Sequence, residues 1–210
     1  GKLFKKYDKT FNFGKNYESA WAVNLRANKI LSIIYESIKG KGLNVGLDVA
    51  ASDRWDGNTY VGRSTEQHFL FLIKLVKKFK IGYVEDPFHE DDFDNFSLFT
   101  KKVKGVMVCG DDLLVTNVKR LKIALEKRSV NTVLVKPNQI GTVSDTMKFV
   151  EMAKRHGLKT VLSHRSGETD DSIIAHLAVG FGVDYAKFGI SGERIVKLNE
   201  LIRIEEKIKG

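Results

Sequence analysis

The sequence predicts an α/β fold, an incomplete (β/α) barrel with about six to seven of the eight βα units that close such a barrel. Six short apolar runs rich in Val, Leu and Tyr recur along the chain, as expected of parallel strands buried on both faces. Each run ends in a residue that is charged or able to bind a metal, and these are Asp48, Glu85, Asp111, Lys136, His164 and Lys187. The intervals between them are 37, 26, 25, 28 and 23 residues (85−48, 111−85, 136−111, 164−136, 187−164), about the length of one strand, one helix and two loops.

The placement of these six residues has a structural consequence. The carboxyl ends of the parallel strands of a (β/α) barrel converge on one rim, where residues far apart in sequence meet. We therefore expect three carboxylates, two lysines and one histidine to share one mouth of the fold. Charged groups at the ends of buried apolar runs are the exception to explain, and they point to chemistry at this rim.

The helices between the strands have recognisable start and stop signals. Residues 1–14 form a basic, glycine-punctuated lead-in with a further short strand at 10–13, and a helix is expected over 20–38. Ser64 and Gln67 fit a capping box at the start of the next helix. The later helices are expected from Asn117 as cap through Arg128, from Ser144 as cap over 145–156 with Gly157 just past the end, and from the residue after Gly192 through Ile208.

Composition places the chain among ordinary globular proteins. With 210 residues, 42% hydrophobic and 29% charged, we expect a single partial barrel domain over 1–210 and no second domain. No apolar stretch approaches the roughly 20 residues that cross a bilayer, so no membrane association is expected. Cys109 is the only cysteine, which excludes an internal disulfide and favours a reducing, cytoplasmic setting, with this residue acting as a small buried hydrophobe.

The chain carries a net charge of +9. Its lysines are spread over expected helix faces rather than gathered in an Arg-rich block with interleaved aromatic residues. We interpret the charge as a solvated basic surface and expect no nucleic-acid partner.

Six motifs in order carry a resemblance to a known family. They are GLDVAAS (46–52), VEDPF (84–88), GDDLLVTN (110–117), KPNQIGT (136–142), SHRSGETDD (163–171) and ISGERIVKLNELIRIEE (190–206). Together they resemble the carboxyl-terminal barrel of enolase, in an archaeal-like form. The resemblance implies a lyase, phosphopyruvate hydratase, which catalyses the reversible Mg²⁺-dependent dehydration of 2-phosphoglycerate to phosphoenolpyruvate in glycolysis and gluconeogenesis.

Asp48, Glu85 and Asp111 stand where the family has its three metal-binding carboxylates. Hard oxygen ligands that leave room for water and substrate suit Mg²⁺, so the chemistry agrees with the resemblance. Each acid alone has an ordinary alternative as a loop cap or an ion-pair member, but three together at strand ends favour a metal site. Asp86 and Asp112 are neighbours of this set, and adjacent strand residues point to opposite faces.

The resemblance also assigns the lysines, the histidine and their neighbours. Lys136 matches the general base that removes the proton beside the substrate carboxylate, and Lys187 matches the lysine that binds that carboxylate. Enolase-type sites in general combine a Lys or His base with one or two Mg²⁺ ions. His164, Arg165 and Ser166 match the substrate-binding segment, in which the arginine fork and the serine hold the phosphate. The remaining histidines are interpreted as ordinary core or surface groups, namely His68, His89, His156 and His176.

Glu18 aligns with the family's general acid, in the segment YESAWAVN over 17–24. The family has GDEGG there, whereas this chain has Tyr17 before the glutamate and Ser19 after it. As a plain acid at a helix start, Glu18 has an equally good alternative explanation.

None of the six motifs corresponds to the family's amino-terminal capping domain or to the first segment of its barrel. The resemblance therefore implies either the carboxyl-terminal part of a split or truncated enolase, with a separate amino-terminal portion as partner, or part of a longer chain with further residues upstream. Enolases are generally oligomers. A closing serine loop in that portion excludes water and supplies a ligand for a second metal ion. Two alternatives remain beside the enzyme: a non-catalytic enolase-like binding or scaffold protein, and a lyase of the same superfamily that acts on another carboxylate.

Overall fold

The computed structural model describes residues 1–210 and has six strands. They are β1 (Val45–Asp48), β2 (Ile81–Glu85), β3 (Met107–Gly110), β4 (Thr132–Val135), β5 (Lys159–Ser163) and β6 (Tyr185–Lys187). All six predicted strand ends are confirmed. Each of the six charged or metal-binding residues named above is either the last residue of its strand or the first residue after it.

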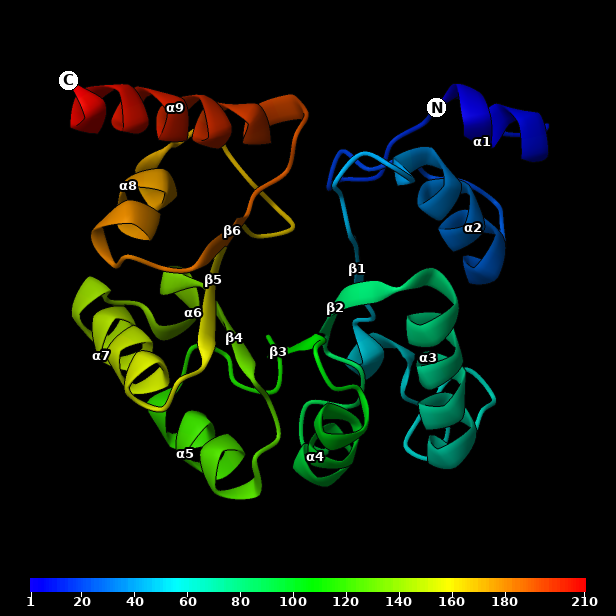
Figure 1. The fold of residues 1–210 in the computed structure, drawn as a ribbon, viewed down its shortest axis with the longest axis horizontal. Coiled ribbons are helices and arrows are strands. Elements are labelled where there is room, and N and C mark those ends of the chain that lie inside the picture. Colours follow the sequence, from blue (N-terminus) through cyan, green and yellow to red (C-terminus); the bar gives the residue numbers. More distant parts are fainter. The chain divides into compact units, whose positions relative to one another are not determined.

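Helices alternate with these strands from β1 onward (Figure 1). The helices are α1 (Lys2–Tyr7), α2 (Ala27–Ile38), α3 (Thr65–Phe79), α4 (Phe93–Lys102), α5 (Val118–Lys127), α6 (Pro137–Ile140), α7 (Val143–Arg155), α8 (Ile173–Gly180) and α9 (Ile195–Lys209). Short 3₁₀ turns lie at Ala51–Arg54 and Gly192–Arg194. None of the helices combines the length and the apolarity needed to cross a bilayer.

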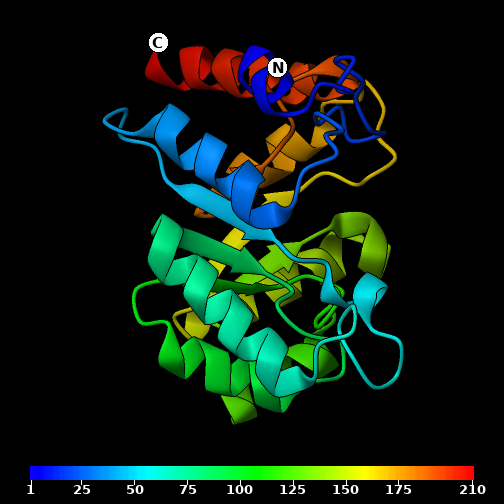
Figure 2. The ribbon, with the colours of Figure 1, turned by 90° about the vertical axis from the view of Figure 1, so that its right-hand side faces the viewer.

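The chain forms two compact units, one of residues 34–160 and the other of residues 1–33 and 161–210. In the larger unit β1, β2, β3 and β4 are parallel and pair in sequence order. Figures 1 and 2 show α3, α4 and α5 on one side of these strands. In the other unit β6 pairs in parallel with the end of β5. This repeated parallel pairing with intervening helices is the predicted βα order.

Apolar strand and helix residues make the core of the larger unit. The side chains of Val84, Val108 and Val133 are fully buried. Beside them, Phe88 after β2 packs its ring 5.8 Å from the ring of Phe99 in α4, measured between centroids. This aromatic packing anchors α4, a helix that the sequence analysis did not name, on the strands.

Phe99→Ala is expected to lower the free energy of unfolding by about 3–5 kcal/mol, because it leaves a cavity among buried aromatic rings. Leu98 on the same helix is 58% exposed, so Leu98→Ala serves as the matched control and should change stability by only about 0.5 kcal/mol. Urea denaturation followed by circular dichroism measures both variants. Equal losses would contradict the assignment of this cluster to the core.

Two of the predicted helix N-caps are confirmed and one is wrong. Ser64 and Gln67 form the complete capping box of α3, and the Asn117 side chain accepts the backbone N–H of Lys119 at the start of α5. The cap of α7 is Thr142 and not Ser144.

The physical reason lies in the turn that precedes α7. Gly141 ends α6 in a left-handed conformation (φ +95°), so the chain is already extended at Thr142 (φ −128°), as an N-cap requires. Ser144 falls inside the first helical turn. Gly157 follows α7 with φ +72°, which confirms its predicted place just past the helix end.

The amino end differs from the prediction. The helix expected over 20–38 begins only at Ala27, and no strand forms at 10–13. The buried carboxylate of Asp8 accepts the backbone N–H groups of Phe11 and Asn24, at 3.2 and 2.7 Å. These bonds give the backbone partners outside a helix or sheet, which is how short acidic side chains compete with regular structure.

Candidate functional site

The larger unit places four of the predicted site residues at the carboxyl ends of consecutive strands. Asp48 and Glu85 are partners in the register of β1 and β2, and Glu85 is opposite Cys109 of β3. Asp111 follows β3 and Lys136 follows β4. Glu85 and Asp111 are only 1% and 7% exposed, whereas Asp48 is exposed. Two buried carboxylates at neighbouring strand ends require compensating charge.

Part of that compensation is an ion pair. The amine of Lys136 donates a hydrogen bond to Oδ2 of Asp111, and the two side chains are 14% and 10% exposed. The other oxygen of Asp111 accepts a hydrogen bond from Nε2 of Gln139 at 3.1 Å. Gln139 in turn accepts the hydroxyl proton of Thr116 at 2.8 Å, and this hydroxyl accepts the backbone N–H of Lys136 at 2.9 Å. The side chains of Lys136 and Asp111 are thus held by a closed polar network.

Asp86 supports the same network from the end of β2. Its backbone is left-handed (φ +40°), an uncommon conformation that turns the buried carboxylate back toward the next strand end. Its two oxygens accept the backbone N–H groups of Asp111 at 2.9 Å and Asp112 at 2.8 Å. Burial raises the pKa of Asp86 well above its usual value, and the charge of Asp111 raises it further. Asp86 therefore orients the segment that carries Asp111.

Glu85 has its own support. The phenol of Tyr83, two residues earlier on the same face of β2, donates a hydrogen bond of 2.5 Å to Oε2 of Glu85. Burial raises the pKa of Tyr83, and so do the neighbouring Cys109 and Glu85, which keeps the phenol a donor. Burial also raises the pKa of Cys109, which is completely inaccessible. The prediction that this cysteine is a buried hydrophobe is confirmed.

The donor set suits a hard divalent cation. Carboxylate oxygens of Asp86, Asp111 and Asp112 lie within 4.8 Å of one another, and Glu85 adds a further buried carboxylate at the adjoining strand end. Burial raises the pKa of Asp112, and the charge of Asp111 raises it further, as expected where like charges converge. Oxygen ligands without sulfur or imidazole are the ligands that Mg²⁺ prefers.

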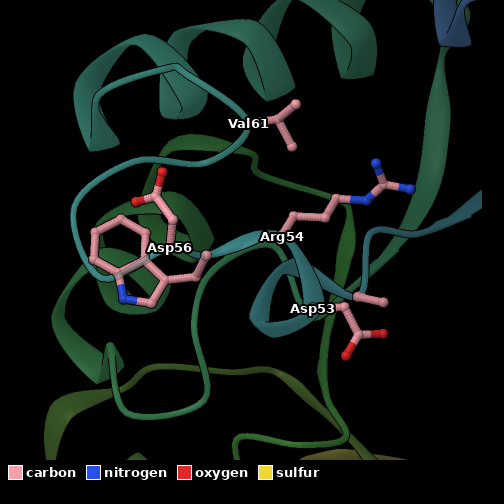
Figure 3. A pocket seen from close by; sticks show the side chains of 6 residues that line it. Asp53, Arg54, Asp56 and Val61 are labelled. Atoms are coloured by element: carbon pink, nitrogen blue, oxygen red, sulfur yellow. The ribbon is translucent and has the colours of Figure 1, made fainter.

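A pocket of about 500 Å³ opens in the loop after β1 (Figure 3). It is lined by Ala50, Asp53, Arg54, Trp55, Asp56 and Val61. The charge of Asp53 contributes to the raised pKa of Asp112, which places this pocket within electrostatic reach of the strand ends. Figure 3 shows Arg54 and Val61 along one side of the opening and Asp56 along the other.

His68 has the ordinary role that the sequence analysis gave it. It is buried on α3, stacks on Tyr60 at 4.3 Å between ring centroids, and forms a hydrogen bond of 2.8 Å between Nε2 and the carbonyl of Pro87. The hydroxyl of Tyr60 accepts the backbone N–H of His89. Both aromatic residues therefore hold the turn after β2 in place.

The other unit contains the remaining predicted site residues. They are Glu18, His164, Arg165, Ser166 and Lys187. The backbone N–H of His164 donates to the carbonyl of Lys187 at 3.2 Å, so β5 and β6 bring these two residues together. Nδ1 of His164 accepts the backbone N–H of Gly189 at 3.1 Å, which leaves the proton of a neutral imidazole on Nε2. Arg165 and Ser166 are exposed on the following loop.

Burial lowers the pKa of His164, and the positive charges of Arg194 and Lys187 lower it further. The charge of Glu18 acts in the opposite direction, which shows that this carboxylate is within electrostatic reach of the imidazole. Glu18 is exposed on a turn, where its backbone N–H donates to the side chain of Asn16. Because α2 begins at Ala27, the alternative explanation of Glu18 as a helix-start acid is wrong.

This lowered pKa makes stability depend on pH. The folded-state pKa of His164 lies below the unfolded value of 6.5, so unfolded molecules bind more protons and stability falls as the pH drops below about 6.5. In His164→Asn the amide oxygen can still accept the Gly189 N–H but has no such titration. The loss of unfolding free energy between about pH 8 and about pH 5 should therefore be smaller than in the parent chain.

Urea denaturation at the two pH values measures this difference. His156→Asn is the matched control, because His156 is exposed at the end of α7. A variant of His164 with an unchanged pH dependence would show that His164 is not held neutral. The buried His68, whose pKa burial also lowers, should keep part of the acid sensitivity in every variant.

Comparison with known proteins decides the family. Residues 2–210 match the family model described as "Enolase, C-terminal TIM barrel domain". This chain belongs to the enolase family. The predicted incomplete (β/α) barrel and the resemblance to an enolase carboxyl-terminal barrel are both confirmed.

Individual enolases agree over nearly the whole chain. The enolase of Archaeoglobus fulgidus is 45% identical over 216 residues, which cover 98% of this chain and 53% of that relative. The enolases of Methanocorpusculum labreanum and Picrophilus torridus are 45% and 44% identical, over 92% and 99% of this chain and 52% and 55% of those relatives. The chain therefore spans about half the length of the curated enolases it matches.

Some residues of this enolase-family chain support the site although the sequence analysis gave them no role. Gln139 lies inside the quoted motif KPNQIGT, and its position one helical turn after Lys136 was the available signal. Tyr83 was readable as the same-face neighbour of Glu85. Arg194 and Lys197 carried no signal, because a basic residue on an amphipathic helix is ordinarily exposed.

Proposed function

We propose that this chain is the catalytic carboxyl-terminal portion of an enolase, which reversibly dehydrates 2-phosphoglycerate to phosphoenolpyruvate in the glycolysis and gluconeogenesis of the cytoplasm. The observation that carries the proposal is the buried pair of Lys136 and Asp111 at adjacent strand ends. A lysine base beside a carboxylate metal ligand is suited to proton abstraction next to a substrate carboxylate.

Lys136 is the proposed general base. Its side chain is largely buried and is aimed at Asp111 by the network of Gln139 and Thr116. A carboxylate of Asp111 engaged by a metal ion would be a weaker partner for the Lys136 amine, which would release that amine from its ion pair and leave it available to the substrate. Site assembly and activation of the base are thereby coupled.

Asp48, Glu85 and Asp111 are the proposed ligands of Mg²⁺. When bound, the ion supplies positive charge that stabilises the negative charge developing on the substrate carboxylate. Tyr83 and Asp86 hold two of these carboxylate segments, through the hydrogen bond to Glu85 and through the backbone of Asp111. We assign Asp86 a supporting role, because its two oxygens accept the backbone N–H groups of Asp111 and Asp112 and so fix the segment that carries Asp111.

The remaining groups are proposed to bind the substrate. Arg165 and Ser166 hold the phosphate, His164 donates from Nε2, and Lys187 pairs with the substrate carboxylate. Glu18 is the proposed general acid that protonates the departing hydroxyl, and its charge already acts on His164.

We propose an amino-terminal enolase portion as the partner, and a homo-oligomer as the assembled state. The chain has six strands, whereas a closed barrel has eight. Gly46 and Asp48 of β1 are exposed, as are Tyr185 and Ala186 of β6, and parallel strands are ordinarily covered on both faces. Further strands that cover these residues would complete the rim.

The test is turnover of 2-phosphoglycerate with Mg²⁺ by the purified chain, alone and mixed with the amino-terminal portion of the Archaeoglobus fulgidus enolase. Turnover in either case supports the proposal, and turnover only in the mixture assigns the partner. Absence of turnover in both, with metal and substrate still bound, would favour the non-catalytic scaffold instead. Turnover of another hydroxy acid but not of 2-phosphoglycerate would favour a different lyase of the superfamily.

A further inference from the structure

The start of α9 buries two cationic side chains. Arg194 is completely inaccessible and Lys197 is 1% exposed, which makes them two of the most deeply buried charged groups in the chain. Removing an arginine and a lysine from water is costly unless their donors find partners. The hydrogen-bond partners of these two side chains therefore indicate the role of their burial.

Those partners lie mainly on the loop after β5. The guanidinium of Arg194 donates to the backbone carbonyls of Arg165 (3.4 Å) and Ser166, and also contacts the carboxylate of its neighbour Glu193. Nζ of Lys197 donates to the carbonyl of Thr169 at 2.7 Å and lies 3.6 Å from a carboxylate oxygen of Glu168. Two cations thus hold three carbonyls within five consecutive residues.

Gly189 makes room for the buried side chain of Arg194. A Cβ atom at this position would lie 2.3 Å from Cδ of Arg194, so only glycine lets the arginine pass. The N–H of Gly189 also donates to Nδ1 of His164. Gly189 therefore both leaves space for the side chain of Arg194 and orients the imidazole of His164, the residue that precedes the loop.

The arrangement is not explained by stability alone. Nε of Arg194 has no hydrogen-bond partner although it is buried, and such an unsatisfied donor costs free energy. The Arg165 and Ser166 side chains remain exposed while the carbonyls of the same residues are held. A loop is suited to positioning a ligand when its backbone is fixed by buried hydrogen bonds and its side chains are exposed to solvent.

We propose that Arg194 and Lys197 are positioning residues that hold loop 165–169 in its binding conformation and thereby set the affinity for the phosphorylated substrate without touching it. This inference rests on the proposed function, because the loop is the proposed phosphate site. The positive charge of Arg194 also lowers the pKa of His164, so the same residue influences both the shape and the electrostatics of the site.

The test compares Arg194→Met and Lys197→Met with Arg203→Met and Lys207→Met, which remove exposed cations of α9. The expected result is a KM for 2-phosphoglycerate raised more than about tenfold in the first pair and unchanged in the second, with kcat within about threefold throughout. Amide hydrogen exchange of residues 165–169 should become faster in the first pair only. In Arg194→Met the pKa of His164, followed by NMR, should rise.

Arg194→Lys keeps a buried cation with fewer donors, and it should recover part of the affinity. If Arg194→Met does not fold, Arg194→Lys and Lys197→Met decide the matter. Folded variants with unchanged loop exchange, or with faster exchange and unchanged KM, would overturn the proposal. If the parent enzyme does not turn over 2-phosphoglycerate, the proposed function fails and the affinity claim falls with it, while loop exchange still shows whether the two cations hold the loop.

Discussion

Replacement of Lys136 by alanine should lower kcat for 2-phosphoglycerate by about 10²–10⁴-fold, the range that a general base contributes. Exchange of the substrate's carbon-bound proton with solvent should be lost to the same extent, because it reports the abstraction step directly. Affinity for Mg²⁺ should rise rather than fall, since the amine that now pairs with Asp111 is gone. The assay uses the turnover-competent assembly, and titration calorimetry measures the metal affinity.

Lys148→Ala is the matched control for this experiment. Lys148 is 69% exposed on α7 and pairs with Asp145, so its loss should leave turnover and metal affinity unchanged. The direction of the change in metal affinity separates the two roles of Lys136. A variant of Lys136 that retains proton exchange would assign the base to another group, and one with weakened metal binding would mean that the pair with Asp111 supports the metal site.

Asp111→Asn is expected to have the second large effect. The neutral amide has the same shape but lacks the charge that holds both the metal and Lys136. Loss of an outer-shell partner commonly weakens metal affinity by about 10–100-fold, so loss of a direct ligand should cost at least that much. Turnover should fall with it, and raising the Mg²⁺ concentration should restore only part, because the partner of Lys136 is also removed.

Asp145→Asn provides the control, since this carboxylate is 45% exposed on α7 and makes a salt bridge of 2.8 Å with Lys148. Titration with Mg²⁺ of both variants and the parent chain gives the comparison. Unchanged metal affinity in Asp111→Asn would remove this residue from the ligand set and leave Asp48 and Glu85 with a different third ligand.

Much of the fold follows from short-range rules that the sequence displays. The strand ends were predictable because buried parallel strands are continuous apolar runs, and a charged residue marks the point where each run leaves the core. The capping box of Ser64 and Gln67 was predictable because both of its hydrogen bonds lie within four residues. Motifs of this kind also carried the family resemblance, which the comparison with known enolases confirmed.

The predictions of helix starts were wrong where residues outside the helix determine the backbone conformation. The helix expected from residue 20 begins at Ala27, because Asp8, sixteen residues before Asn24, takes the N–H of Asn24. Serine is intrinsically a better N-cap than threonine, but the left-handed Gly141 made Thr142 the cap and placed Ser144 inside the first turn. Each case depends on a conformation elsewhere in the chain that local propensity does not contain.

The sequence by itself determined that Asp48, Glu85, Asp111 and Lys136 lie at successive strand ends, because apolar periodicity sets where strands stop. Only the tertiary structure decided which of these groups touch. The contact of Lys136 with Asp111, the return of Asp86 to the next strand and the burial of Arg194 under loop 165–169 all join residues about 25 to 29 positions apart. Such contacts depend on strand register and helix packing, which form only when the whole core closes around them.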